Sequence, residues 1–158
     1  MRVAVCPATT VVDTVVGVPM RWMYRAVGTA TAPVVVPDLS ATAPNMTNVA
    51  QVMIYLSKNV TLQRPHVTNA ADKGIYVLSS EDVLVDRGDV TGSRGIGIAV
   101  KDTRRTIVID TNVTASGGHG VWIAGGGSNA VLGSVSSQNG GSGVLAENVA
   151  GVTIDRSA

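Results

Sequence analysis

A glycine followed by a β-branched residue returns every 23 residues through the second half of this chain. The pairs are Gly74-Ile75, Gly97-Ile98, Gly120-Val121 and Gly143-Val144. A fixed period of about 20 to 30 residues is typical of a solenoid, in which each repeat forms one coil and stacks only on its neighbours. The chain is therefore expected to wind about an axis with about 23 residues in each coil.

Two further columns of residues support this spacing. Short apolar runs recur at 60–62, 83–85, 107–109, 130–132 and 152–154, and Val-Thr or Val-Ser pairs recur at 67–68, 90–91, 113–114 and 135–136. Each repeat thus contains three short β-rich runs separated by Gly, Ser, Asn and Asp, which is the pattern of strands bounded by turns. The spacing leaves no room for a helix of about ten residues.

Runs such as Asn59-Val60-Thr61-Leu62 and Gly74-Ile75-Tyr76-Val77-Leu78 resemble the right-handed parallel β-helix family. This is the pectin-lyase-like fold of polysaccharide lyases, some glycoside hydrolases and phage tailspikes. The resemblance covers residues 51–158 and implies an all-β solenoid with three strands per coil. It implies no single activity, because one fold supports many chemistries.

Residues 1–50 differ in composition from the rest of the chain. Five of the six prolines lie there, whereas 16 of the 18 glycines lie beyond residue 58. Gly28 nevertheless falls 23 residues before Gln51, which falls 23 before Gly74. We therefore expect residues 1–50 to form degenerate coils, an N-terminal cap or a docking segment, followed by a parallel β-helix over 51–158.

Alternation along each strand predicts which side chains enter the core. In the first apolar column the inward set is expected to be Val60, Leu62, Val83, Val85, Ile107, Ile109, Ala130 and Leu132. In the Gly column it is expected to be Ile75, Val77, Ile98, Val100, Val121 and Ile123.

The intervening residues then point outward and form two largely apolar stripes. One stripe contains Thr61, Leu84, Val108, Val131 and Thr153, and the other contains Met53, Tyr76, Ala99, Trp122 and Leu145. A soluble monomer rarely exposes so long an apolar surface, so another chain or a ligand is expected to cover it. The candidate interface or ligand residues are Tyr76, Trp122, Leu145, Leu84, Val108 and Val131. Tyr76 and Trp122 suit stacking on sugar rings, but aromatic side chains are also enriched at subunit interfaces.

A polar column provides the candidate catalytic residues. Asp86 and Asp110 are expected to lie outward about one rung apart, near the separation of roughly 5 Å between the two carboxylates of a retaining glycosidase. Like charges at that distance raise one pKa and so prepare an acid. The alternative is that Arg87 or solvent simply neutralises both carboxylates.

Composition argues against several other classes. A formal net charge of +1 gives no basic face for nucleic acid, and no apolar run reaches the roughly 18 residues of a membrane span. The first apolar segment ends at Pro7, too early for a classical secretion signal, and the lone Cys6 excludes an internal disulfide.

His66 and His119 lie in different columns without ligand neighbours, so no metal site is expected. No cofactor is expected either, since a strand and not a helix follows the glycines at 125–127.

Three functional hypotheses remain. The first is a non-enzymatic structural or adhesive protein of a phage or virion appendage, a spike or fibre. It would form a homotrimer and lie on a virion or extracellular surface, with other virion proteins and a polysaccharide as further candidate partners. The second is a polysaccharide hydrolase or lyase that uses Asp86 and Asp110 over a groove floored by Tyr76 and Trp122. The third is a glycan-binding module that depends on Trp122.

Overall fold

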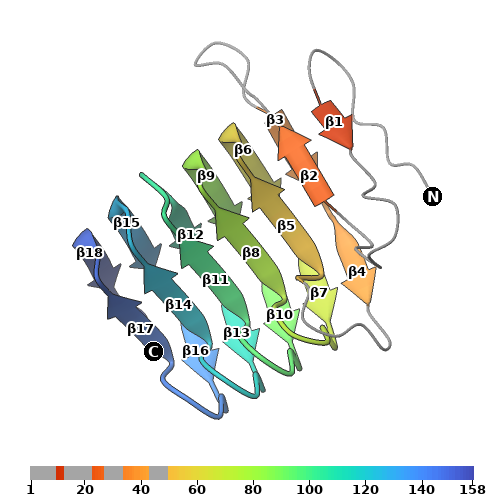
Figure 1. Cartoon of the computed structure of the whole chain (residues 1–158). Helices are drawn as coiled ribbons and strands as arrows, with labels where there is room; N and C mark the ends of the chain where they lie inside the picture. Colours follow the sequence, from red (N-terminus) through yellow and green to blue (C-terminus); the bar gives the residue numbers. More distant parts are fainter. Residues whose placement is uncertain (1–9, 13–22, 27–33, 43–49) are drawn as a thin grey trace.

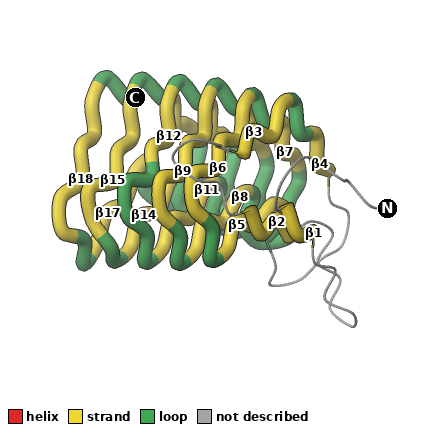
Figure 2. The backbone as a smooth tube through the Cα atoms, turned by 90° about the horizontal axis from the view of Figure 1, so that it is seen from above, coloured by secondary structure: helices red, strands yellow, loops and turns green. Residues whose placement is uncertain are grey.

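The computed structural model describes residues 10–12, 23–26, 34–42 and 50–158. Within these ranges the chain consists of strands and turns with no helix, and successive coils stack along one axis (Figures 1 and 2). The predicted solenoid with three strands in each coil is therefore confirmed. Most of residues 1–50, including Cys6, lies outside the described ranges.

Three sheets run along the solenoid, and each complete coil contributes one strand to each of them, whereas the last described coil contributes to only two. The seven-stranded sheet contains β1 (Thr10–Val12), β2 (Met23–Ala26), β5 (Val52–Tyr55), β8 (Ile75–Leu78), β11 (Ile98–Lys101), β14 (Val121–Ala124) and β17 (Val144–Glu147). The six-stranded sheet contains β3 (Val34–Pro37), β6 (Lys58–Gln63), β9 (Glu81–Asp86), β12 (Ile107–Ile109), β15 (Gly127–Leu132) and β18 (Ala150–Asp155). The five-stranded sheet contains β4 (Ser40–Thr42), β7 (His66–Thr68), β10 (Asp89–Thr91), β13 (Asn112–Thr114) and β16 (Val135–Ser137).

Neighbouring strands are parallel, apart from the antiparallel pair of β1 and β2. Strands β3 and β4 already stack in register on β6 and β7, so coil-like pairing begins before residue 51. Parallel pairing in register places residues 23 apart directly above one another, as with Ile75 and Ile98. Side chains far apart in the sequence are thereby collected into columns about 4.8 Å apart.

The core is a stack of small branched side chains inside the coil. Ile75, Val77, Ile98, Val100, Val121 and Ile123 are fully buried, as predicted for the Gly column. Burial of each of these side chains contributes about 1.5 to 3 kcal/mol. The absence of Phe is consistent with this packing, because like side chains repeat from coil to coil.

The predicted orientation is wrong in two strands of the six-stranded sheet. Val108 and Val131 are 1% and 0% exposed and point inward. The expected inward residues of the same strands instead point outward and are partly exposed, namely Ile107, Ile109, Ala130 and Leu132. The reason is that the coils keep a spacing of 23 residues here. Arg104 pairs with Glu81 on the preceding coil and with Gly127 on the following coil. The position above Val83 therefore belongs to Thr106 and not to Ile107.

Polar residues occupy the core at this point because they form hydrogen bonds between coils. Asn129, one coil after Thr106, is only 2% exposed. Its Oδ1 accepts hydrogen bonds from the Thr106 backbone N–H at 2.9 Å and from the Thr103 hydroxyl at 3.2 Å. A buried amide side chain is tolerated when its partners are in place. These bonds explain how Thr106 and Asn129 replace Val60 and Val83 of the preceding coils.

Hydroxyl groups at the corners perform a similar function. Ser80, Ser134 and Ser157 each accept a hydrogen bond from the backbone N–H of the residue 23 positions earlier, at 3.1 to 3.3 Å.

The corners themselves use left-handed backbone conformations. One column of positive φ contains Asp38, Arg64, Arg87, Asp110, Gly133 and Arg156. Each non-glycine member costs about 1 to 2 kcal/mol, which the hydrogen bonds between coils offset.

Candidate functional site

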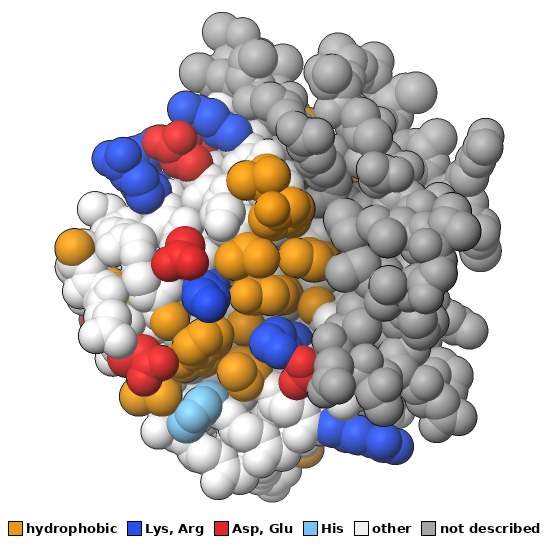
Figure 3. All heavy atoms as spheres, in the orientation of Figure 1, with side chains coloured by type: hydrophobic (Ala, Val, Ile, Leu, Met, Phe, Trp, Pro, Cys, Tyr) orange, Lys and Arg blue, Asp and Glu red, His pale blue; other side chains and the backbone are white. Residues whose placement is uncertain are grey.

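The outer face of the seven-stranded sheet carries a column of large apolar side chains. Backbone pairing aligns Met53, Tyr76, Ala99, Trp122 and Leu145, which we call the aromatic face. Figure 3 shows hydrophobic side chains gathered on the side of the molecule that carries β5, β8, β11 and β14 in Figure 1. The outward direction predicted for Tyr76, Trp122 and Leu145 agrees with this register and with their partial exposure.

Ala99 determines the shape of the aromatic face. It points outward, yet it is 0% exposed, because it lies in register between the larger side chains of Tyr76 and Trp122. The two aromatic residues are two strands apart, or about 10 Å along the solenoid axis. The small Ala99 thus separates the two rings within one column.

Charged side chains hold both rings. The indole Nε1 of Trp122 donates a hydrogen bond to Oε1 of Glu147 at 3.0 Å. Nζ of Lys73 lies 5.5 Å from the centre of the Tyr76 ring, in cation–π geometry, and Lys73 also forms an ion pair with Asp72. Partial burial, and then the charge of Asp102, raise the pKa of Tyr76.

The contacts of Glu147 and Lys73 with the two rings were not predicted from the sequence. Glu147 lies 25 residues after Trp122, which corresponds to one coil and two residues. Its side chain is thus on the same face of the next strand. The 23-residue period contains that signal, but the choice of rotamer that makes the hydrogen bond is not visible in it.

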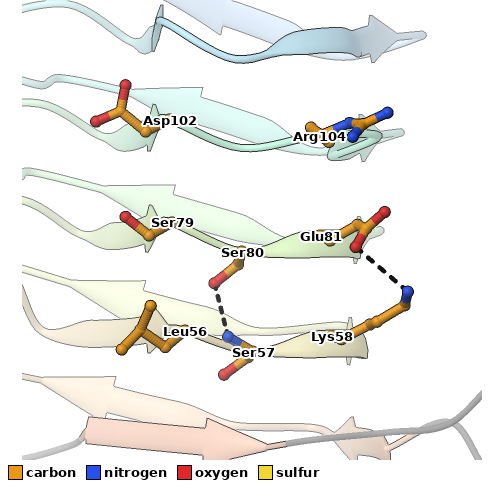
Figure 4. Close-up of a pocket in the computed structure, with 8 residues that line it drawn as sticks. All are labelled: Leu56, Ser57, Lys58, Ser79, Ser80, Glu81, Asp102 and Arg104. Carbon is orange, nitrogen blue, oxygen red and sulfur yellow. Dashed lines mark hydrogen bonds and ion pairs between the residues drawn. The ribbon is translucent and has the colours of Figure 1, made fainter.

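A polar groove lies where the seven-stranded sheet turns into the six-stranded sheet. It has a volume of about 370 Å³ and is lined by Leu56, Ser57, Lys58, Ser79, Ser80, Glu81, Asp102 and Arg104. We call it the corner groove. In Figure 4, Leu56, Ser79 and Asp102 lie along one side and Lys58, Glu81 and Arg104 along the other, with Ser57 and Ser80 between them. The groove therefore runs parallel to the solenoid axis.

One wall of the corner groove is held by ion pairs between coils. Lys58 Nζ lies 3.3 Å from Glu81 Oε2, Arg105 Nε lies 2.6 Å from Asp82 Oδ1, and Arg105 also pairs with Glu81. Hydrogen bonds from Arg105, and then from Lys58, lower the pKa of Glu81, and a hydrogen bond from Arg105 lowers the pKa of Asp82. Both carboxylates thus stay ionised near neutral pH, which does not suit a general acid.

Arg105→Gln is expected to raise the pKa of Asp82 toward its ordinary value, and that of Glu81 by less because Lys58 remains. Since both pKa values are depressed in the fold, these groups stabilise it above their ordinary pKa values, and that contribution is lost as the pH falls through the folded values. The variant should lose less stability across this acid range. Carboxyl titration by NMR measures the shifts.

Arg94→Gln is the control, because Arg94 is exposed and forms no ion pair with either carboxylate. Equal titration curves for the wild type and Arg105→Gln would contradict the role given to Arg105.

The predicted carboxylate pair does not share a column. Asp86 pairs in register with Ile109, and its carboxylate lies 2.7 Å from the guanidinium of Arg87. Asp110 occupies the next column, at a corner with φ 48°. The expected alignment of Asp86 with Asp110 is therefore wrong, for the same one-residue reason as in the strands. A catalytic role for either carboxylate stays a prediction.

The expected interface stripe of Leu84, Val108 and Val131 also changes. Leu84 points outward, but Val108 and Val131 are buried and cannot contact a ligand or a second chain. Ile107 and Ala130 take their places above Leu84. Among the described residues, no three His, Cys, Asp or Glu side chains cluster as metal ligands.

Comparison with known proteins identifies the family. Residues 45–157 match the family model described as the right-handed β-helix region. The chain belongs to the right-handed β-helix family. None of the curated proteins compared with this β-helix matches it. No helix in the described part of the β-helix is long and apolar enough to cross a membrane.

Solved structures with a similar fold include three polysaccharide-modifying enzymes. A double mutant of the periplasmic alginate epimerase AlgG aligns with 86% of this chain at a TM-score of 0.72 and 13% identity. The alginate lyase of Paenibacillus sp. strain FPU-7 aligns with 84% at 0.65 and 15% identity. Pectate lyase Pel9A aligns with 75% at 0.59 and 12% identity. The alignments span only 36%, 56% and 40% of those chains. The likeness concerns the fold.

Proposed function

We propose that this β-helix binds a polysaccharide along the aromatic face. The observation that carries the proposal is the pair of partly exposed rings, Tyr76 and Trp122, in one column with a small residue between them. The C–H faces of sugar rings are apolar and pack on aromatic rings, while sugar hydroxyls need polar groups at the edges. Lys73, Lys101 and Glu147 provide such groups beside the rings.

The shape of the face favours a linear polymer over a small ligand. The column runs along the solenoid axis, so successive sugar units would meet equivalent positions on successive coils. Small-molecule sites are usually concave and enclose most of their ligand, whereas this surface is shallow. The hydrogen bond to Glu147 and the ammonium group of Lys73 hold the rings before binding, which reduces the entropy lost on binding.

Three solved proteins with a similar fold also support the proposal, at the level of the fold. An alginate epimerase, an alginate lyase and a pectate lyase act on polysaccharides, and they share this architecture. An extracellular or periplasmic location, where such polymers occur, is part of the proposal. Nothing in the comparisons supports a phage or virion appendage, and the virion hypothesis stays a prediction.

The decisive experiment compares Trp122→Ala with the wild-type chain. Binding to a panel of neutral and acidic soluble polysaccharides is measured by affinity electrophoresis and then by calorimetry for the polymer that binds. We expect the dissociation constant to rise by about 10-fold or more, because a central aromatic anchor commonly contributes over 1 kcal/mol. Tyr76→Ala should weaken binding in the same direction.

Val135→Ala is the matched control, since Val135 is an exposed apolar side chain on the five-stranded sheet. It should leave the dissociation constant unchanged. If no polymer in the panel binds, or if Trp122→Ala binds as well as the wild type, the aromatic face is not the binding site.

An enzymatic alternative is favoured by the corner groove beside the face. Asp102 lines this groove, and it forms no ion pair within the described part of the chain. We expect the chain to bind the polymer without cleaving it. Cleavage is measured by the release of reducing ends and of unsaturated products. Turnover that is abolished by Asp102→Asn, by Asp86→Asn or by Asp110→Asn would instead establish a hydrolase or lyase.

A further inference from the structure

The outer surface of the six-stranded sheet carries a compact set of apolar side chains. Leu84, Ile107 and Ala130 align in one column, and Ile109 and Leu132 align in the next. All five point outward and are partly exposed. We call this set the apolar grid. It occupies a different sheet from the aromatic face.

Charged side chains border the apolar grid on both sides, and most of them are paired within the chain. Where the strands begin, Lys58, Glu81, Asp82 and Arg105 form the ion pairs of the corner groove. Where the strands end, Arg64 pairs with Asp38 and Arg87 pairs with Asp86. These pairs leave little net charge to attract a partner.

Next to β12, Arg104 and Asp110 are the charged residues of these borders that form no ion pair with a described residue. Arg104 lies three residues before β12 and Asp110 directly after it, and both side chains are exposed. They belong to the same coil and carry opposite charges. Ile107, in the centre of the apolar grid, lies three residues from each of them along the sequence. Arg104 and Asp110 are thus equally distant from Ile107 along the sequence, one before it and one after it.

We propose that two copies of this chain pack their six-stranded sheets against each other, related by a two-fold axis parallel to the solenoid axes. A half-turn about such an axis exchanges the beginning and the end of the strands but keeps each coil at its own level. Arg104 of each copy then faces Asp110 of the other, and the column of Leu84, Ile107 and Ala130 meets the same column of the second copy. A two-fold interface requires this kind of self-complementary surface.

The size of the surface indicates a reversible dimer. Six strands about 4.8 Å apart and about 20 Å long give a planar area of roughly 500 Å² per copy. Specific stable interfaces bury about 800 Å² per partner, so this smaller dimer is expected to dissociate on dilution. Two copies cover both grids and leave both aromatic faces open. The proposal therefore does not depend on polysaccharide binding.

Sedimentation velocity over a wide range of concentration tests the proposal. The mass is expected to rise from 16.1 kDa toward twice that value as the concentration increases. Arg104→Asp and Asp110→Arg should each raise the dimer dissociation constant by about 10-fold or more, because like charges then meet at two places. The double variant restores opposite charges and should return the constant to within about threefold of the wild-type value.

Two further variants complete the experiment. Ile107→Asp, which buries a charge at the centre, should abolish the dimer, whereas Lys101→Asp on the aromatic face should leave it unchanged. Circular dichroism verifies that each variant is folded, and position 110 should accept arginine because Arg64 and Arg87 adopt the same backbone conformation in earlier coils. A monomer at every concentration, a trimer, or a dimer indifferent to the charge exchange would each overturn the two-fold arrangement.

Discussion

Gly126→Ala is expected to lower the free energy of unfolding by at least about 3 kcal/mol, an effect at the upper end for a single methyl group. Gly126 lies at the corner between β14 and β15 with φ +68°. A Cβ there would lie 1.8 Å from the Thr103 carbonyl oxygen and 2.6 Å from the Thr103 nitrogen. Because both contacts are with backbone, two coils must separate. That movement disrupts the bond from Gly127 N–H to the Thr103 carbonyl, which measures 2.9 Å.

Gly151→Ala separates the steric contact from the backbone conformation. Gly151 also has positive φ, at +85°, but the nearest heavy atom to its Cβ would be 3.9 Å away. Gly151→Ala should lower the free energy of unfolding by only about 1 to 2 kcal/mol, which is the cost of a left-handed alanine. Urea denaturation followed by circular dichroism measures both variants. Equal losses would show that the contact with Thr103 is unimportant.

Asn129→Leu is expected to lower the free energy of unfolding by about 2 to 4 kcal/mol, although the side chains are similar in size. The change removes the acceptor of the Thr106 N–H and of the Thr103 hydroxyl, both in the buried interior. An unsatisfied buried donor costs about 1 to 3 kcal/mol. The Thr106 hydroxyl is also buried without a hydrogen-bond partner, so this part of the core is already short of one hydrogen bond.

Asn112→Ala is the matched control for Asn129→Leu. The Asn112 side chain forms an exposed hydrogen bond with Asp89 at 3.1 Å, and water replaces that bond easily. Its loss should change stability by less than about 0.5 kcal/mol. If the two variants are equally stable, the hydrogen bonds of Asn129 do not hold the two coils together.

Period and alternation in the sequence determine much of this fold. Because each coil contacts only the next, a residue pattern repeated every 23 positions specifies the whole architecture. The columns of Ile75 and Val77 inside and of Tyr76 and Trp122 outside follow directly from alternation within short strands. The aromatic face was therefore predictable down to its residues, and the hydrogen bond to Glu147 was not.

The tertiary structure alone decided the details of the six-stranded sheet. An apolar run is a reliable marker of the core only when every core position is apolar. Thr106 and Asn129 break that rule, and only their hydrogen bonds between coils make their burial stable. The apolar run is therefore displaced by one residue relative to the unbroken register, which places Val108 inside the coil and Asp110 in the column next to that of Asp86. The corner groove is likewise a product of stacking, because its ion pairs join residues such as Glu81 and Arg105 on different coils. Sequence periodicity determines which residues are neighbours, whereas the hydrogen bonds and charges between coils determine which of them face inward and which form a site.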